Sequence, residues 1–176
     1  MKPPLLILRN TCCTRNKSMK DEGWSSVSLN LRCLAQWEAN RCNSYDLSTK
    51  NVTVLLHGLA FANGVALSKD SDFVLVTQTT AKNVLRYWLR GPRANTVDTF
   101  FNLQGAPDNI NRNINAEFWV AENSAGRGKA VKLDAQGNFL DVVDGFNPVS
   151  HVEQRYGNLW IGSVVNKFVG VILNFV

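Results

Sequence analysis

The sequence lacks the features that mark membrane-spanning, zinc-binding and signal-bearing chains. No uncharged apolar run reaches the roughly 18 residues that a spanning helix needs, which excludes such a helix. The four cysteines form no C-x-x-C pair and have no histidine at metal-ligand spacing, so we expect no zinc site: Cys12, Cys13, Cys33 and Cys42. The segment Met1–Arg9 has only four apolar residues before a charge, too few for an intact signal peptide.

The sequence also lacks a concentrated basic patch, although its formal net charge is +5. Residues 1–50 hold eight Lys and Arg against four Asp and Glu, whereas residues 51–176 hold eleven against ten and are nearly neutral. Nucleic-acid binding requires clustered positive charge, and single-strand binding also requires aromatic side chains interleaved with it. We therefore expect no nucleic-acid partner.

What the sequence does contain is a repeat with a period of 41 to 45 residues. Three short apolar strands begin 45 and then 41 residues apart: Phe73–Thr77, Phe118–Glu122 and Leu159–Ser163. A comparable segment precedes each of them, beginning at Ala62, Pro107 and Val149. A further strand follows each of them: Leu85–Trp88, Ala130–Leu133 and Val169–Ile172. Such internal periodicity is typical of repeat architectures.

Two of these units have a predicted fourth strand, Val97–Phe101 and Phe139–Val143, and turn-forming residues separate the strands. Four short strands per period of this length correspond to one blade of a β-propeller. A β-sandwich is the alternative, but it would not require strands and turns to recur at matched offsets. We predict an all-β chain, an incomplete propeller of about three blades of four-stranded antiparallel meander.

The remaining segments set the expected domain boundaries. Ser44–Lys50 and Asn51–Leu56 are predicted to be the last two strands of a preceding blade. Residues 1–40 show no matching strand pattern, so we expect a divergent leader at 1–40 and a partial propeller domain at 41–176. This division predicts a truncated propeller whose open blade edges can pair with a second copy, and a chain prone to aggregation when alone.

Polar residues at the start of two innermost strands suggest a metal site. Asn63 lies in one such strand, and Asp108 and Asn109 lie in the next. Innermost strands of a propeller converge on its axis, so these oxygens could meet around a hard cation such as Ca²⁺, which takes six to eight oxygen ligands. The alternative is that all three are turn residues bonded to nearby backbone.

Other candidate residues carry weaker hypotheses. His57 and His151 have no nucleophile placed by a recognisable motif. Gly126–Lys129 is predicted to be a hairpin loop and not a phosphate loop. Asn51 begins a glycosylation sequon that matters only if the chain is secreted. Three tryptophans inside repeat strands are predicted to lie in the core between blades: Trp88, Trp119 and Trp160.

Several long stretches in order carry a family resemblance: Gly58–Ser68, Leu85–Pro92, Gly105–Ile110 and Gly157–Ser163. From about Tyr45 to Ile172 the chain resembles the C-terminal half of the plant strictosidine synthase-like proteins. The resemblance implies a six-bladed propeller and a role in plant secondary metabolism such as alkaloid biosynthesis. It also implies full-length relatives that carry a secretory signal and are routed to the vacuole or secreted.

The name-giving activity of that family is a Pictet–Spengler condensation of tryptamine with the aldehyde secologanin, assigned to a carbon–nitrogen lyase, with one glutamate as the base. The matching position, seven residues before Gly157, is Ser150. A serine hydroxyl without an activating partner is too weak a base for this step. The resemblance therefore implies no confident catalytic residue and no strictosidine synthase activity.

The wider propeller superfamily also contains calcium-dependent lactonases and arylesterases. In that resemblance Asn63, Asp108 and Asn109 match axial ligands, while a glutamate ligand expected from the first blade has no counterpart. The implied alternatives are a calcium-dependent ester or lactone hydrolase and a non-catalytic binding module for a small molecule. Calcium is the cofactor that the first alternative would need.

Overall fold

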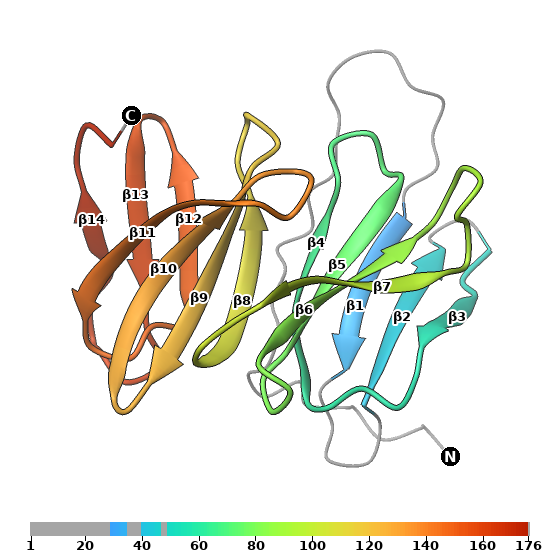
Figure 1. Cartoon of the computed structure of the whole chain (residues 1–176), viewed down its shortest axis with the longest axis horizontal. Coiled ribbons are helices and arrows are strands. Elements are labelled where there is room, and N and C mark those ends of the chain that lie inside the picture. Colours follow the sequence, from blue (N-terminus) through green and yellow to red (C-terminus); the bar gives the residue numbers. More distant parts are fainter. Residues whose placement is uncertain (1–28, 35–39, 47–48, 176) are drawn as a thin grey trace, which may run out of the picture.

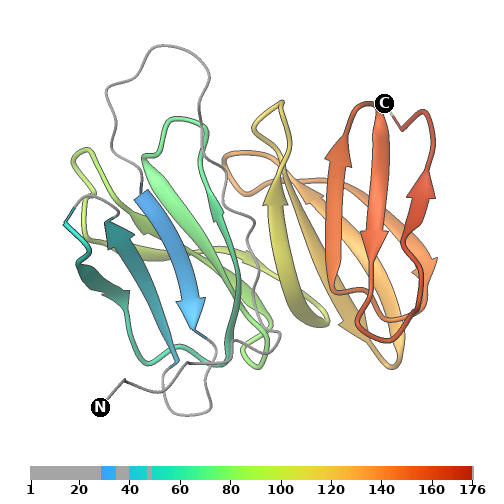
Figure 2. The ribbon, with the colours of Figure 1, turned by 180° about the vertical axis from the view of Figure 1, so that it is seen from behind.

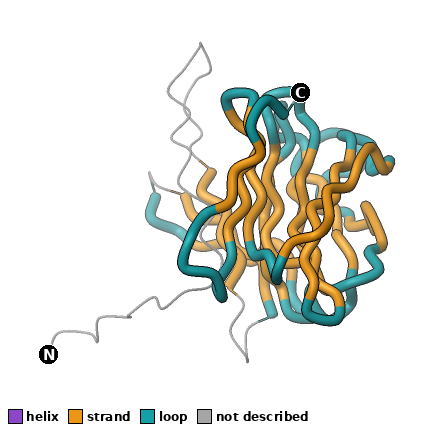
Figure 3. The backbone as a smooth tube through the Cα atoms, turned by 90° about the vertical axis from the view of Figure 1, so that its left-hand side faces the viewer, coloured by secondary structure: helices purple, strands orange, loops and turns teal. Residues whose placement is uncertain are grey.

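The computed structural model describes residues 29–34, 40–46 and 49–175, and of residues 29–34 it describes the backbone path. Throughout these residues the secondary structure consists of strands and turns (Figure 3). None of the described residues belongs to a helix long and apolar enough to cross a membrane.

The strands form sheets that each follow the chain in order (Figure 1). The first sheet has β1 (Leu29–Leu34), β2 (Arg41–Asp46) and β3 (Val52–Leu56). The second has β4 (Ala62–Leu67), β5 (Phe73–Gln78), β6 (Asn83–Trp88) and β7 (Val97–Asn102). The third has β8 (Ala106–Arg112), β9 (Phe118–Ser124), β10 (Arg127–Leu133) and β11 (Phe139–Phe146). The fourth has β12 (His151–Arg155), β13 (Asn158–Gly162) and β14 (Gly170–Ile172).

Within each sheet, consecutive strands pair antiparallel, so every sheet is a meander. The sheets stand side by side in chain order, as the view from behind also shows (Figure 2). The strands β4 to β14 lie where the repeat places them, with bounds that differ by a few residues from those predicted. The predicted antiparallel blade meander is therefore confirmed.

The strand β1 was not predicted from the sequence. It lies before residue 40 and pairs with β2 along its whole length, from Leu29 opposite Asp46 to Leu34 opposite Arg41. Pairing with β2 stabilises this strand, and such cross-strand contacts are not visible in a short segment of sequence. The predicted leader up to residue 28 lies outside the described residues, and the division at residue 40 stays a prediction.

The hydrophobic core is divided among the spaces between sheets. In β5 all side chains are buried, because Phe73 and Leu75 face the third sheet while Val74 and Val76 face the first. A third cluster, with Trp119 at its centre, joins the third sheet to the fourth. The inner strands of the second and third sheets are thus buried on both faces by the neighbouring sheets, as in the blades of a propeller, whereas the outermost strands β7 and β11 are largely exposed.

The prediction for the tryptophans is partly wrong. Trp119 is fully buried and Trp88 packs against the core, as expected. Trp160, however, is 39% exposed. On β13 it alternates with Leu159 and Ile161, which face the third sheet, so its own side chain points to the opposite face of the fourth sheet.

Candidate axial site

The predicted site residues lie in β-bulges of two innermost strands. The register of β4 against β5 shifts between Ala62 and Val65, the stretch that holds Asn63. The register of β8 against β9 shifts between Pro107 and Ile110, the stretch that holds Asp108 and Asn109. Bulges redirect side chains and occur often beside active sites. All three predicted residues therefore occupy equivalent irregular positions in adjacent blades.

Two threonines, Thr77 near the end of β5 and Thr79 just after it, hold the bulges together. The Thr77 hydroxyl accepts a hydrogen bond from Gly64 N at 2.6 Å and donates one to the Asp108 carbonyl at 2.7 Å. The Thr79 hydroxyl accepts from Asn63 Nδ2 at 3.2 Å and donates to the Pro107 carbonyl at 2.7 Å. These bonds satisfy backbone groups that the bulges remove from the strand ladders, and they fix β4 against β8.

Gly64 allows the two innermost strands to approach closely. A Cβ atom at this position would lie 2.6 Å from Ile110 N, 2.7 Å from Asn109 Cα and 2.8 Å from the Asp108 carbonyl oxygen. These atoms are backbone, so they cannot move aside as a flexible side chain would. Gly64 is therefore a steric requirement of the site.

The Asp108 carboxyl group is the acidic centre of the cluster. Burial raises the pKa of Asp108 to about 6, although hydrogen bonds from the Asn63 side chain and the Asn109 backbone oppose the shift. The carboxylate form therefore lacks full compensation for its lost hydration. A bound cation would supply that compensation.

Asn109 contributes an acceptor that is buried and has no hydrogen-bond partner, its Oδ1 atom. Its Nδ2 atom is used fully, because it donates to the Ser150 carbonyl at 2.7 Å and lies 3.3 Å from Asp108 Oδ1. Buried polar atoms are rarely left unpaired, and a bound ion is one of the usual reasons for an exception.

Ser150 lies beside this cluster. Its carbonyl accepts hydrogen bonds from both nitrogens of Asn109, and its N–H donates to the Gly162 carbonyl at 2.9 Å. Its side chain is buried. The structure thus brings the position implied for the family glutamate next to the three predicted ligands, on three consecutive blades.

The types of donor atom in this cluster suit a hard cation. One carboxylate and two side-chain amides, from Asp108, Asn63 and Asn109, offer the oxygen ligands that Ca²⁺ prefers. They are fewer than the six to eight that calcium takes, so water or other residues would complete the shell. Among the described residues no group of three or more His, Cys, Asp and Glu lies close enough together to hold a metal ion.

Sequence reasoning missed a row of alternating asparagines that supports the site and that we name the asparagine row: Asn109 and Asn111 in β8, and Asn113 directly after it. The row faces the segment 150–154, which includes most of β12. Their Nδ2 atoms donate to the Ser150 carbonyl at 2.7 Å, the Val152 carbonyl at 2.8 Å and Gln154 Oε1 at 2.7 Å, respectively. The period of two in Asn-Ile-Asn-Arg-Asn was the pattern that could have revealed it.

The other sequence candidates lie elsewhere. His57 is exposed just after β3. His151, in β12, contacts Asn111 and lies 3.9 Å from Glu153. The predicted hairpin loop Gly126–Lys129 is confirmed only in part, because Gly126 lies in the turn between β9 and β10 while Arg127 to Lys129 belong to β10. Asn51 is exposed beside the start of β3, a position that a glycan could reach.

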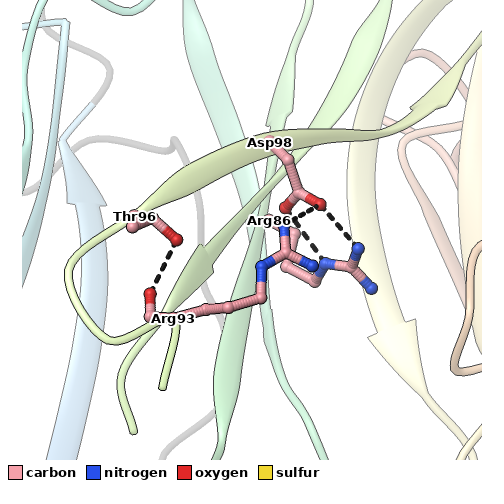
Figure 4. A network of polar contacts seen from close by, with 4 residues as sticks. All are labelled: Arg86, Arg93, Thr96 and Asp98. Carbon is pink, nitrogen blue, oxygen red and sulfur yellow. Dashed lines mark hydrogen bonds and ion pairs between the residues drawn. The ribbon is translucent and has the colours of Figure 1, made fainter. Parts of the chain in front are cut away.

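A second polar cluster lies on β6, β7 and the connection between them (Figure 4). Arg86 binds Asp98 through two hydrogen bonds of 3.1 and 2.6 Å, and Arg93 binds the same carboxylate at 2.9 Å. These hydrogen bonds, that from Arg86 above all, hold the pKa of Asp98 below its ordinary value. The two guanidinium groups lie over the Trp88 ring at 4.6 and 4.7 Å, so this cluster covers an aromatic part of the core.

Comparisons with known proteins agree with the sequence resemblance. A sequence model of the family described as strictosidine synthase matches residues 24–92. The chain is 41% identical over 175 residues to strictosidine synthase-like 10 of Arabidopsis thaliana, covering 76% of this chain and 47% of that protein. It is 30% identical over 146 residues to strictosidine synthase of Catharanthus roseus, covering 76% of this chain and 41% of that protein. The chain spans less than half the length of these relatives.

Among solved structures, a gluconolactonase from Xanthomonas campestris is similar with a TM-score of 0.59 and 17% identity, over 69% of this chain and 40% of that one. The structural neighbours are β-propeller proteins, and at this identity the likeness concerns the fold alone. The propeller prediction is thereby confirmed.

Proposed function

The chain belongs to the strictosidine synthase-like family, and on that premise we propose that it is a calcium-binding propeller protein of plant secondary metabolism that hydrolyses neutral esters or lactones. It does not catalyse the Pictet–Spengler condensation. The observation that carries the proposal is the buried, unpartnered Oδ1 of Asn109 beside the Asp108 carboxyl group.

Ser150 supports the proposal that the chain does not catalyse the Pictet–Spengler condensation. The condensation needs a base that takes a proton from the intermediate formed between an amine and an aldehyde. Ser150 donates and accepts through its backbone, and no histidine or carboxylate is bonded to its hydroxyl among the hydrogen bonds of the described residues. A hydroxyl without such a partner remains protonated near neutral pH.

The candidate cation site supports the proposal of calcium-dependent hydrolysis. Asn63, Asp108 and Asn109 would hold Ca²⁺ through their side-chain oxygens, and the hydrogen bond from Asn109 Nδ2 to the Ser150 carbonyl would keep Asn109 in place. A bound calcium ion supplies Lewis-acid polarisation of a substrate carbonyl. The overall reaction adds water across one acyl–oxygen bond, and it yields a carboxylic acid and an alcohol from an ester, or a hydroxy acid from a lactone.

Calcium binding tests the proposal most directly. Isothermal titration at pH 7.5 is expected to give one Ca²⁺ site in the wild-type chain and none in Asp108→Asn. Asp144→Asn is the matched control, because Asp144 is an exposed carboxylate on β11. Equal Ca²⁺ affinity in wild type and Asp108→Asn would contradict the site.

Activity is measured separately, on phenyl acetate and on a γ-lactone, with the chelator EGTA as control. We expect hydrolysis that EGTA abolishes, and no product from tryptamine plus secologanin. Product formation from that pair would overturn the assignment made from Ser150. Calcium binding without ester or lactone hydrolysis would indicate that the chain is a non-catalytic binding module and not an enzyme.

Self-association is a second candidate, favoured by the exposed face of the fourth sheet. Trp160 and Val171 are cross-strand neighbours on β13 and β14 and both are exposed. Sedimentation velocity over a hundredfold range of protein concentration tests it, and a constant sedimentation coefficient would exclude it. A pairing through this face would be weakened by Trp160→Asn.

A further inference from the structure

Two of the four cysteines occupy directly opposed positions in the first sheet. Cys33 belongs to β1 and Cys42 to β2, and the antiparallel register pairs these two residues with each other. The register is continuous along the whole of Leu29–Leu34, and Figure 1 shows the two strands side by side. The two cysteines are therefore neighbours across the strands.

The register alone sets a separation that a disulfide bond can span. Directly opposed residues of an antiparallel pair lie on the same face of the sheet, with Cα atoms about 4.5 or 5.5 Å apart according to the type of pair. A disulfide bond joins residues whose Cα atoms are about 4.4–6.8 Å apart. Both types of pair fall within that range, so Cys33 and Cys42 can be bridged without a shift of register.

The surroundings of Cys42 favour a structural bond over a reactive thiol. Its side chain is fully buried and its thiol is free in this structure. It packs in a hydrophobic cluster with Leu59, Ala62 and Val65. Reactive cysteines are partly exposed and lie beside a cation or a helix N-terminus, whereas a cysteine buried among apolar groups is inert. Among the described residues Cys42 also belongs to no group that could hold a metal ion.

We propose that Cys33 and Cys42 form a disulfide bond between β1 and β2 when the chain folds under oxidising conditions. The bond joins two cysteines of one chain and leaves the remaining pair, Cys12 and Cys13, as thiols. The inference goes beyond the proposed hydrolase, because it requires neither calcium nor an ester substrate. Failure of either proposal therefore leaves the other standing.

Glutathione disulfide is a sufficient oxidant for the bond. The thiolate of one cysteine attacks glutathione disulfide, which gives a mixed disulfide and releases one glutathione thiolate. The thiolate of the second cysteine then attacks the mixed disulfide and releases the second glutathione. One sulfur–sulfur bond forms in the chain and one is lost from glutathione disulfide. Because Cys42 is buried in the folded chain, the exchange takes place before the second sheet covers it.

The bond fixes the register of β1 on β2. A slip of one residue would carry one cysteine to the opposite face of the sheet, where the bond cannot form. The bond also closes a loop of ten residues, from position 33 to position 42, and so restricts the unfolded chain. Reduction is therefore expected to lower the unfolding temperature by roughly 5–10 °C.

Peptide mapping of the full chain tests the proposal. The chain is folded in glutathione buffer, its free thiols are alkylated, and the monomer band of a non-reducing gel is digested with trypsin. Cleavage after Arg32, Arg41 and Lys50 places each of the two cysteines in its own peptide, 33–41 and 42–50. We expect one linked peptide, whose mass is the sum of the two minus two hydrogens, and which separates on reduction.

A pair shifted by one residue is the matched control. In a Cys12→Ser, Cys13→Ser background, Cys42→Ser is combined with Asn43→Cys, which keeps the same tryptic peptides. The new cysteine lies on the opposite face of β2, so we expect its equilibrium constant for oxidation by glutathione to be lower by roughly tenfold or more. In concentrated urea the original pair should lose this advantage, because only the folded chain holds the register.

Four results would overturn the proposal. They are alkylated and unlinked peptides after folding in oxidised glutathione, a link from either peptide to Cys12 or Cys13, a link found only in covalent dimers, and equal oxidation of the original and shifted pairs. An oxidation constant of the original pair that is the same in urea as in buffer would also contradict it, and this measurement does not depend on the folding of any variant.

Discussion

At the scale of single residues, Asp108 links the site to pH. Burial disfavours the charged form and raises the pKa of Asp108 from its ordinary value of 3.8 to about 6 in the folded chain. Its contribution to stability is therefore fully present below pH 3.8 and is lost as pH rises through about 6. Without calcium, we expect Asp108→Asn to unfold at a higher temperature than wild type at pH 7.5, and the difference to shrink toward pH 4.

Calcium reverses the sign of that difference. The cation binds the ionised carboxylate, so it should raise the unfolding temperature of wild type at pH 7.5 and have little effect at pH 4. Asp108→Asn should not respond to calcium at either pH. Thermal unfolding followed by circular dichroism, with and without EGTA, measures all of these differences. A wild-type chain more stable than the variant in EGTA at pH 7.5 would contradict the burial argument.

Gly64 is the second residue on which the site depends. Gly64→Ala would bring a methyl group within 2.8 Å of three backbone atoms of β8, so β4 and β8 must separate. We expect a loss of roughly 1–3 kcal/mol in the free energy of unfolding, the range for overpacking, together with weaker calcium binding. Gly170→Ala is the control, since its Cβ atom has ordinary contacts. Urea denaturation compares the two, and equal stabilities would contradict the steric role.

At the scale of elements, the asparagine row joins the inner strands of two blades. Asn111 Nδ2 donates to the Val152 carbonyl at 2.8 Å, a group on the edge of β12 that no strand of the described residues pairs. We expect Asn111→Ala to cost about 1–2 kcal/mol, because a half-buried carbonyl loses its donor. Asn102→Ala, at the exposed end of β7, should change the free energy of unfolding by less than about 0.5 kcal/mol. Hydrogen exchange should rise in β12 in the first variant only.

The sequence predicted the strands better than their irregularities. The repeat predicted the positions of β4 to β14. A strand that is buried on both faces needs a continuous apolar run, and a run such as Phe73–Thr77 recurs in every repeat. The repeat did not predict β1, because this strand depends on pairing with β2. It also did not predict that Trp160 is exposed, because exposure depends on which face of the sheet a neighbouring sheet covers. The bulges at Asn63 and Asp108 have no local pattern either, since they arise from mismatched registers between strands.

The residues of the candidate site stay a prediction, and their contacts could not be predicted from the sequence. Asn63, Asp108 and Asn109 were proposed because they are polar residues at the start of apolar innermost strands. Their support by Thr77 and Thr79, and the unpartnered oxygen of Asn109, follow from the distances between blades. Those distances depend on how closely Gly64 lets β4 approach β8, and a single sequence does not give this separation.

At the scale of the whole molecule, stability depends on the contacts between sheets. The largest aromatic group lies between the second and third sheets, where Phe118 meets Phe73 at 6.2 Å and Phe100 at 5.9 Å between ring centroids. Phe118 belongs to β9, while its two partners belong to β5 and β7. Repeat architectures derive their stability from such interfaces between neighbours, so damage at one interface should affect both adjoining blades.

Phe118→Ala tests this coupling. Phe118 is fully buried, so we expect a loss of about 3–5 kcal/mol in the free energy of unfolding. Because the lost contacts reach across to β5 and β7, hydrogen exchange should increase in the second sheet as well as in the third, and least in the first. Phe139→Ala, which removes a half-exposed ring from β11, should leave exchange in the second sheet unchanged. An increase confined to the third sheet would mean that each blade is stable by itself, and the interfaces between blades would then contribute specificity and not stability.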